Sequence, residues 1–295
     1  MSSPPRHEIL SDGADTSFAV DMYTDRAVTY DTATGGWHIE FGRDFAEWIA
    51  PAPGSSVLDL ACGTGLVTIP MAVAVGATGT VVGLDITKAM LDQARAKRLP
   101  EGAAAVEWVE ADIAGDLSGL EAVRRVLEEQ GGFDVISCCS AFVMLKDPVA
   151  MMKNWAGLLK TGGRIIVDVP TEQKTVQYLF MEALRVKLGM PLPFKERWVK
   201  DIRSLEKVYE QAGLVLETSW KTKSYVPEEW FEDVETVRDH VFDSQTKELY
   251  LGFEREGKLE EARGAWKDVW KMGVADRKGR VFGGHQLYVS IGTKP

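Results

Sequence analysis

The 295-residue sequence lacks a long apolar run and has only three cysteines and four histidines. Its longest mostly apolar stretch, IPMAVAVGATGTVVGL, is interrupted by one proline, three glycines and two threonines. The N-terminus also lacks the apolar segment of a signal peptide, so we expect neither a membrane span nor secretion. The odd cysteine count favours a reducing, cytoplasmic setting, and no zinc-type spacing of cysteine and histidine occurs.

Positive charge is also scarce. Lysine and arginine number 34 against 44 acidic residues, which gives a net charge of −10. This balance repels phosphate backbones, so we expect a small-molecule partner rather than nucleic acid. The length suits one elaborated α/β domain over residues 18–295, preceded by a flexible tail over 1–17, as a monomer or a homodimer.

Short apolar runs alternate with amphipathic stretches through the middle of the chain. Each run precedes a helical pattern: VLDLA precedes 66–75, GTVVGLD precedes 87–98, VEWVEAD precedes 118–130, FDVISCC precedes 147–160 and GRIIVDVP precedes 172–188. Strands that are apolar on both faces are typical of a parallel sheet covered by helices. The alternation predicts a doubly wound, Rossmann-like α/β fold. With a strand over about 214–225 and an antiparallel C-terminal strand, the sheet has seven strands.

Two segments flank the alternating core, which we place at 51–226. Residues 18–50 show a helical pattern rich in aromatics, and we expect them to form a lid. Residues 227–280 also contain helical patterns, ahead of a last strand within 281–295. We expect this insertion to roof a substrate pocket, because large aromatic surfaces suit small apolar ligands. Its tryptophans are Trp230, Trp266 and Trp270.

The stretch VLDLACGTGLV, residues 57–67, leads from a strand through a glycine-rich turn into a helix. Ligands of doubly wound sheets bind outside the carboxyl ends of the strands, and Gly63 and Gly65 allow a tight turn close to a ligand. Asp85 ends the second strand, where its carboxylate suits two ribose hydroxyls. Asp112 ends the third strand and suits an exocyclic amine such as that of adenine. The pattern predicts a nucleoside cofactor.

Two residues decide between the cofactors that use this layout. A dinucleotide site of the G-x-G-x-x-G type requires glycine where this chain has Thr68, and Asp59 would repel a pyrophosphate. S-adenosylmethionine has no phosphate, and the ammonium of its methionine end can pair with the Asp59 carboxylate. We therefore favour S-adenosylmethionine. An NAD-dependent reductase is a weaker alternative, because no tyrosine is followed by lysine four residues later.

Together with GLDIT, EADI, FDVISCCSAF and LLKTGGRIIV, the glycine-rich stretch resembles the class I S-adenosylmethionine-dependent methyltransferases, in their UbiE-like small-molecule branch. The resemblance covers about residues 20–225 and departs at Ala61, where many members have glycine. It implies that Ile86 and Ile113 sandwich the adenine and that Ser140 faces the sulfonium. The cofactor-binding residues that we expect are Tyr30, Asp59, Ala61, Gly63, Thr64, Gly65, Asp85, Ile86, Met90, Asp112, Ile113 and Ser140.

Aromatic and histidine side chains are candidates for binding the methyl acceptor. The resemblance implies that N-terminal tyrosines close over the cofactor. His38 and His240 are candidate general bases, which are needed only if the nucleophile arrives protonated, and we expect His285 to be structural. The end of the fourth strand, CCSAF, offers no carboxylate for Mg²⁺, so we expect no metal. The substrate contacts that we expect are Tyr23, Trp37, Phe142, Tyr178 and Trp230.

The sequence therefore predicts methyl transfer from S-adenosylmethionine to a small, apolar or aromatic acceptor by in-line displacement, with S-adenosylhomocysteine as the product. The attacking atom, oxygen, sulfur, nitrogen or carbon, is left open. A protein that binds the cofactor without catalysis, as a regulator or partner protein, remains a second hypothesis. A protein substrate is less favoured, because no peptide-binding signature is visible.

Overall fold

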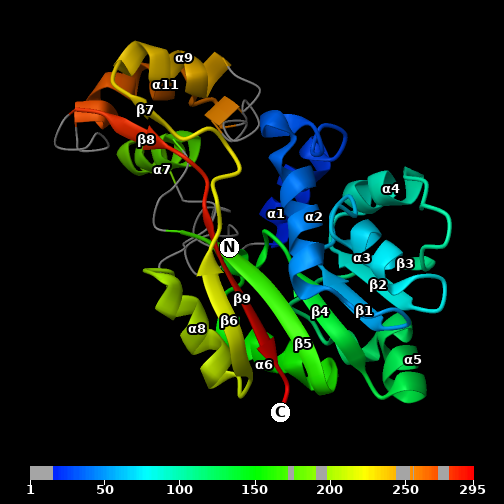
Figure 1. Cartoon of the computed structure of the whole chain (residues 1–295). Helices are drawn as coiled ribbons and strands as arrows, with labels where there is room; N and C mark the ends of the chain where they lie inside the picture. Colours follow the sequence, from blue (N-terminus) through cyan, green and yellow to red (C-terminus); the bar gives the residue numbers. More distant parts are fainter. Residues whose placement is uncertain (1–15, 172–175, 191–197, 244–252, 255, 272–278) are drawn as a thin grey trace, which may run out of the picture.

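A computed structural model of the chain describes residues 16–171, 176–190, 198–243, 253–254, 256–271 and 279–295. Its centre is a seven-stranded sheet in the order β3-β2-β1-β4-β5-β9-β6 (Figure 1). β1 to β5 run parallel, whereas β9 is antiparallel to both β5 and β6. This arrangement confirms the predicted fold. The strands span Ser56–Leu60 (β1), Thr80–Asp85 (β2), Val106–Glu110 (β3), Phe133–Cys138 (β4), Leu159–Pro170 (β5), Val215–Lys221 (β6) and Leu287–Thr293 (β9).

Helices cover both faces of the sheet, so neighbouring residues of one strand enter different hydrophobic clusters. Val57 of β1 packs with α2 and α3, whereas Leu58 packs with α5, α6 and α8. Both side chains are fully buried, as expected for a parallel strand covered on two sides. The helices are α2 (Trp37–Ile49), α3 (Thr68–Val75), α4 (Lys88–Ala96), α5 (Glu121–Gln130), α6 (Pro148–Leu158) and α8 (Ile202–Gln211). In the ranges described, no helix has the length and apolarity to cross a bilayer.

The N-terminal segment is not one continuous helical run. α1 (Thr16–Arg26) is followed by a turn, a short 3₁₀ helix, η2 (Ala33–Gly36), and then α2. In the turn, the Thr29 and Thr32 hydroxyls donate to the carbonyls of Arg26 and Thr29. Threonine side chains that bond the local backbone compete with helix formation, which accounts for the break. The break places Tyr30 at the carboxyl ends of the strands.

A second, smaller unit lies at the end of β6 and β9 that is remote from the C-terminus (Figure 1). It has its own hydrophobic cluster, in which Trp266 stacks on Phe180 at 4.1 Å between ring centroids. Trp266 is almost fully buried and donates from Nε1 to the Val234 carbonyl at 2.7 Å. The unit contains α7 (Val176–Lys187), β7 (Glu229–Phe231), α9 (Val234–Asp243), α11 (Leu259–Val269) and β8 (Val281–Gly283).

This unit adds one element to residues 227–280 and corrects one expectation. The expected helical elements are present, and β7 also pairs antiparallel with β8, two strands of three residues that carry no readable periodicity. Trp266 and Trp270 both stack on Phe180 inside the unit, so they build its core instead of roofing a pocket. The division of the chain at residue 227 stays a prediction.

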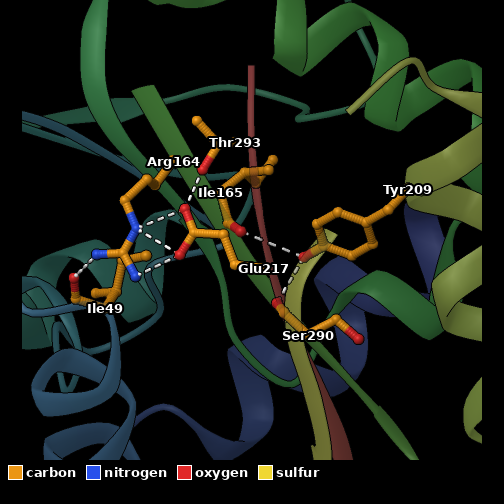
Figure 2. A network of polar contacts seen from close by, with 7 residues as sticks. All are labelled: Ile49, Arg164, Ile165, Tyr209, Glu217, Ser290 and Thr293. Atoms are coloured by element: carbon orange, nitrogen blue, oxygen red, sulfur yellow. Dashed lines mark hydrogen bonds and ion pairs between the residues drawn. The ribbon is translucent and has the colours of Figure 1, made fainter. Parts of the chain in front are cut away.

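A polar network fastens the antiparallel edge of the sheet (Figure 2). Arg164 of β5 donates from Nε and Nη2 to the Glu217 carboxylate of β6 at 3.0–3.1 Å. Its Nη1 donates to the Ile49 carbonyl, at the end of α2, at 2.7 Å. The Thr293 hydroxyl of β9 also donates to Glu217. The fork of one arginine thereby joins helix α2 to the edge of the sheet.

Tyr209 of α8 supplies the buried part of this network. Its Oη donates to the Ser290 carbonyl at 2.6 Å, and the Ile165 carbonyl lies 3.3 Å from the same oxygen. The side chain is fully buried, so water cannot replace the hydrogen bond in a variant that lacks the hydroxyl. We expect Tyr209→Phe to lower the free energy of unfolding by about 1 kcal/mol, measured in urea. Tyr209→Ala, which also removes the ring, sets the larger scale of about 3–5 kcal/mol. A Tyr209→Phe midpoint equal to that of the unmodified chain would rule out a contribution from the hydroxyl.

Candidate functional site

Two adjoining hollows open at the carboxyl ends of the parallel strands. The larger lies among α1 and the ends of β2, β3 and β4, where Asp85 and Asp112 line it. The smaller lies between the glycine-rich turn and α2, where Asp59 and His38 line it. The two hollows share one wall, formed by Tyr30, Ala61, Gly63, Cys139 and Ser140.

All but one of the predicted cofactor residues line these hollows; the exception is Gly65. Residues that the sequence scatters over more than 100 positions are thus brought to one place, although their contacts with a ligand stay predictions. Tyr23, predicted for the substrate, lines the larger hollow. Of the predicted cofactor residues outside the shared wall, Asp59 and Thr64 line the smaller hollow. The larger hollow is lined by Asp85, Ile86, Met90, Asp112 and Ile113.

Asp59 is a buried carboxylate at the end of β1, with 1% of its surface exposed. It accepts hydrogen bonds from the Thr68 hydroxyl at 2.5 Å and the Ser137 hydroxyl at 2.6 Å. Burial raises its pKa to about 6, against the opposing effect of the two hydroxyls. Thr68, where a dinucleotide motif has glycine, is therefore the residue that ties Asp59 to the first turn of α3.

Asp85 holds the glycine-rich turn in shape. Its Oδ2 accepts from the Gly63 N–H and its Oδ1 from the Thr87 N–H, both at 2.8 Å. Burial raises the pKa of this carboxyl, and the two backbone bonds act in the opposite direction. Each oxygen accepts one backbone hydrogen bond, and a carboxylate has about four acceptor positions, so capacity remains for hydroxyl donors of a ligand.

Asp31 and Lys97 fasten the N-terminal segment to the turn, and sequence reasoning missed both. Asp31 accepts from the Thr64 hydroxyl at 2.5 Å and pairs with the Lys97 ammonium at 2.6 Å. Lys97 also donates to the Thr64 carbonyl at 2.7 Å. These residues are 33 or more positions apart and follow no motif, so only the folded chain reveals the contact.

Two residues of the shared wall, Ala61 and Ser140, have left-handed backbones, with φ of 54° and 58°. The Ser140 N–H donates to the Asp168 carboxylate at 2.7 Å, and burial raises the pKa of Asp168 to about 7. Left-handed backbone outside glycine is strained and gathers at functional sites. Ala61 takes this conformation at the position where the resembling family often has glycine.

Three of the predicted substrate residues do not line either hollow. Phe142 is fully buried, with its ring centroid 5.5 Å from that of Trp155. Trp37 stacks on His38 beside the smaller hollow, at 3.7 Å between centroids. Trp230 belongs to the smaller unit, is 47% exposed and lies under Arg280. Contacts of these residues with a substrate stay predictions.

The histidines lie in different surroundings. His38 lines the smaller hollow, whereas His285, expected to be structural, packs edge-on against Trp37 at 4.5 Å. Burial lowers the pKa of His285 to about 4. The side chains of His240 and of Tyr178, a predicted substrate residue, lie outside the described part of the chain. Within the described part, no group of three or more His, Cys, Asp or Glu side chains is placed to hold a metal ion.

The two glycines of the turn have different tasks, which gives a prediction. Both have positive φ, but a Cβ on Gly65 would lie 2.7 Å from the Trp108 ring, whereas one on Gly63 would meet only the flexible end of Met90 at 3.3 Å. We expect Gly65→Ala to lower the thermal midpoint more than Gly63→Ala, whose backbone strain costs about 1–2 kcal/mol. Conversely, Gly63→Ala should weaken S-adenosylhomocysteine binding more in calorimetry, since Gly63 lines both hollows. Equal midpoints for the two variants would contradict the assignment to Trp108.

Comparisons with known proteins agree with this geometry. Residues 57–163 match a family model described as a methyltransferase domain. The chain is 29% identical over 179 residues to a demethylmenaquinone methyltransferase of Lactococcus lactis subsp. lactis (strain IL1403), which covers 55% of this chain and 66% of that protein. It is 31% identical over 169 residues to nocamycin O-methyltransferase of Saccharothrix syringae, covering 56% of each. A match to UbiE of Ectopseudomonas mendocina (strain ymp) is 32% identical over 138 residues, 46% of this chain and 50% of that protein.

Solved structures show the same fold. Magnesium protoporphyrin IX methyltransferase of Synechocystis PCC 6803, with bound SAH, has a TM-score of 0.51 at 19% identity, covering 72% of this chain and 95% of that one. YjhP of E. coli has a TM-score of 0.54 at 16% identity, covering 94% and 99%. The chain spans between about half and two thirds of the length of the curated relatives named above. Residues 57–163 therefore form a methyltransferase domain, and the relatives support its class I S-adenosylmethionine-dependent, UbiE-like kind.

Proposed function

We propose that this protein transfers a methyl group from S-adenosylmethionine to a small apolar or aromatic metabolite, by in-line displacement and without a metal ion. The observation that carries the proposal is the pair of adjoining hollows with separate acidic groups. Asp59 lies in the smaller one, and Asp85 and Asp112 lie in the larger one. One ligand with a cationic amino-acid end and a nucleoside end matches both.

The residues present fit that cofactor, which when bound supplies an electrophilic methyl group. Asp59, desolvated and with a raised pKa, gains from a cationic partner such as the α-ammonium. Asp85 has acceptor capacity left for the ribose hydroxyls. Ile86 and Ile113 line the larger hollow, where they suit the two faces of the adenine. Asp112 accepts one backbone bond, from Ala114, and can accept the adenine amine.

The shared wall suits an apolar acceptor. Tyr30 and Cys139 line it, and burial raises the pKa of both side chains well above the usual range, so both are uncharged at neutral pH. An uncharged wall favours a reaction in which the sulfonium charge disappears, and the main task is to align the two reactants. Two relatives support the acceptor class by name, a demethylmenaquinone methyltransferase and nocamycin O-methyltransferase.

The mechanism that we propose needs few chemical groups from the protein. Thiols, phenols and carbons flanked by carbonyls ionise in part without help, so a general base is needed only for other nucleophiles. The CCSAF stretch at the end of β4, residues 138–142, contains no carboxylate, and hard cations require clustered oxygen ligands, which supports transfer without Mg²⁺. The base roles of His38 and His240 stay predictions.

Transfer of labelled methyl groups tests the proposal. Purified protein is incubated with S-adenosylmethionine labelled in the methyl group and with a metabolite extract rich in quinones and phenols. We expect label in small molecules, undiminished by EDTA. Label only in protein, or tight cofactor binding with no transfer to any extract, would support the protein-substrate or non-catalytic hypothesis instead.

Asp85 gives a quantitative prediction for the cofactor. Asp85→Ala removes a charged acceptor for two hydroxyls, worth roughly 1.5–3 kcal/mol, so the affinity for S-adenosylhomocysteine should fall by about 10- to 150-fold. Because Asp85 also accepts from the Gly63 and Thr87 N–H groups, Asp85→Asn is the matched variant that retains one acceptor oxygen. In calorimetric titration, the affinity of Asp85→Asn should lie between those of the unmodified chain and of Asp85→Ala. Unchanged affinity in Asp85→Ala would make Asp85 a purely structural end of β2.

A further inference from the structure

His38 occupies a fixed position in the first turn of α2. Its ring stacks on Trp37 at 3.7 Å between centroids and also packs against Tyr30, at 4.5 Å between centroids. Three residues of α2 line the smaller hollow, at positions that share one face of a helix: His38, Phe41 and Gly42. The stacking leaves this imidazole little freedom to turn away from that face.

One hydrogen-bonding atom of the His38 ring has no partner in the described part of the chain. His38 Nδ1 is buried and has no hydrogen-bond partner among the described residues. Buried polar atoms without a partner are uncommon in folded proteins, and each costs on the order of 1–3 kcal/mol. Because His38 lines a hollow, a ligand bound there can supply the missing hydrogen bond.

The position of His38 indicates which part of the ligand supplies this hydrogen-bond partner. His38 lines the hollow of Asp59 and Thr64, and it is absent from the larger hollow of Asp85 and Asp112. On the proposed function, Asp59 and the turn receive the amino-acid end of the cofactor and the larger hollow receives the adenosine. We propose that His38 binds the α-amino-acid end of the cofactor, and that it is not the proton acceptor for the methyl acceptor.

The charge state of the ring suits this role. Burial, assisted by the nearby charge of Arg26, lowers the pKa of His38 well below its ordinary value. The imidazole is therefore neutral at pH 7 and adds no repulsion toward the α-ammonium. A neutral imidazole has one donor and one acceptor, so it can serve either polar group of an amino acid.

A pair of ligands separates this role from the others. S-adenosylhomocysteine has the amino-acid end, and 5′-methylthioadenosine has the same nucleoside and sulfur without it. For His38→Phe, which keeps an aromatic ring in the stack, we expect S-adenosylhomocysteine to bind on the order of tenfold more weakly. Methylthioadenosine should bind with unchanged affinity, which also reports that the variant is folded. His38→Asn, which retains polar atoms close to the position of Nδ1, should recover part of the loss.

His285→Phe is the matched control, because His285 packs against the same Trp37 but lines neither hollow. It should bind both ligands like the unmodified chain. Equal weakening of both ligands in His38→Phe would show a merely structural role, and unchanged affinities with slower methyl transfer would show a base; either result overturns the inference. If the unmodified chain binds neither ligand, the proposed function itself fails.

Discussion

The buried carboxylate of Asp59 is the constraint on which the site depends. It lies at the end of β1 and accepts from Thr68 on α3 and Ser137 on β4, so one side chain fixes three elements around the glycine-rich turn. A desolvated carboxylate is costly without compensation, and the two hydroxyls compensate only in part, because its pKa is still raised to about 6. The remaining imbalance favours a cationic ligand in the adjoining hollow.

The rest of the site is arranged around that turn by three further carboxylates that accept hydrogen bonds. Asp85 holds the Gly63 N–H, Asp168 holds the Ser140 N–H, and Asp31 holds the Thr64 hydroxyl. Each carboxylate comes from a different part of the chain. Together they keep the strained residues of the shared wall in place and bring the N-terminal segment over the strand ends, so the hollows depend on this segment as well as on the sheet.

Sequence reasoning recovered the parts of this arrangement that are local. A strand, a tight turn and a helix follow one another in residues 57–67, and acidic residues directly end β2 and follow β3, so spacing alone predicts them. Ser137 is placed opposite Asp59 by the pairing of β1 with β4, which no short stretch encodes. Asp31 and Lys97 likewise meet only after the chain has folded.

The expectation that Trp266 and Trp270 line a pocket was wrong for a physical reason. A tryptophan at helical spacing has the same pattern whether it faces a ligand or a core, and Trp266 and Trp270 face the core around Phe180. The strands β7 and β8 escaped prediction because three residues are too few to show alternation. Placement of the smaller unit beside the end of β6 and β9 is therefore information that only the structure supplies (Figure 1).

The most direct measurement is a titration of the Asp59 carboxyl carbon by NMR, in protein labelled with ¹³C-aspartate and assigned with Asp59→Asn. Alone, the carboxyl should titrate with a pKa of about 6. Saturation with S-adenosylhomocysteine should lower that pKa, because the α-ammonium stabilises the ionised form. A pKa that saturating S-adenosylhomocysteine leaves unchanged would contradict the account, since Asp59 would then have no contact with the charged end of the cofactor.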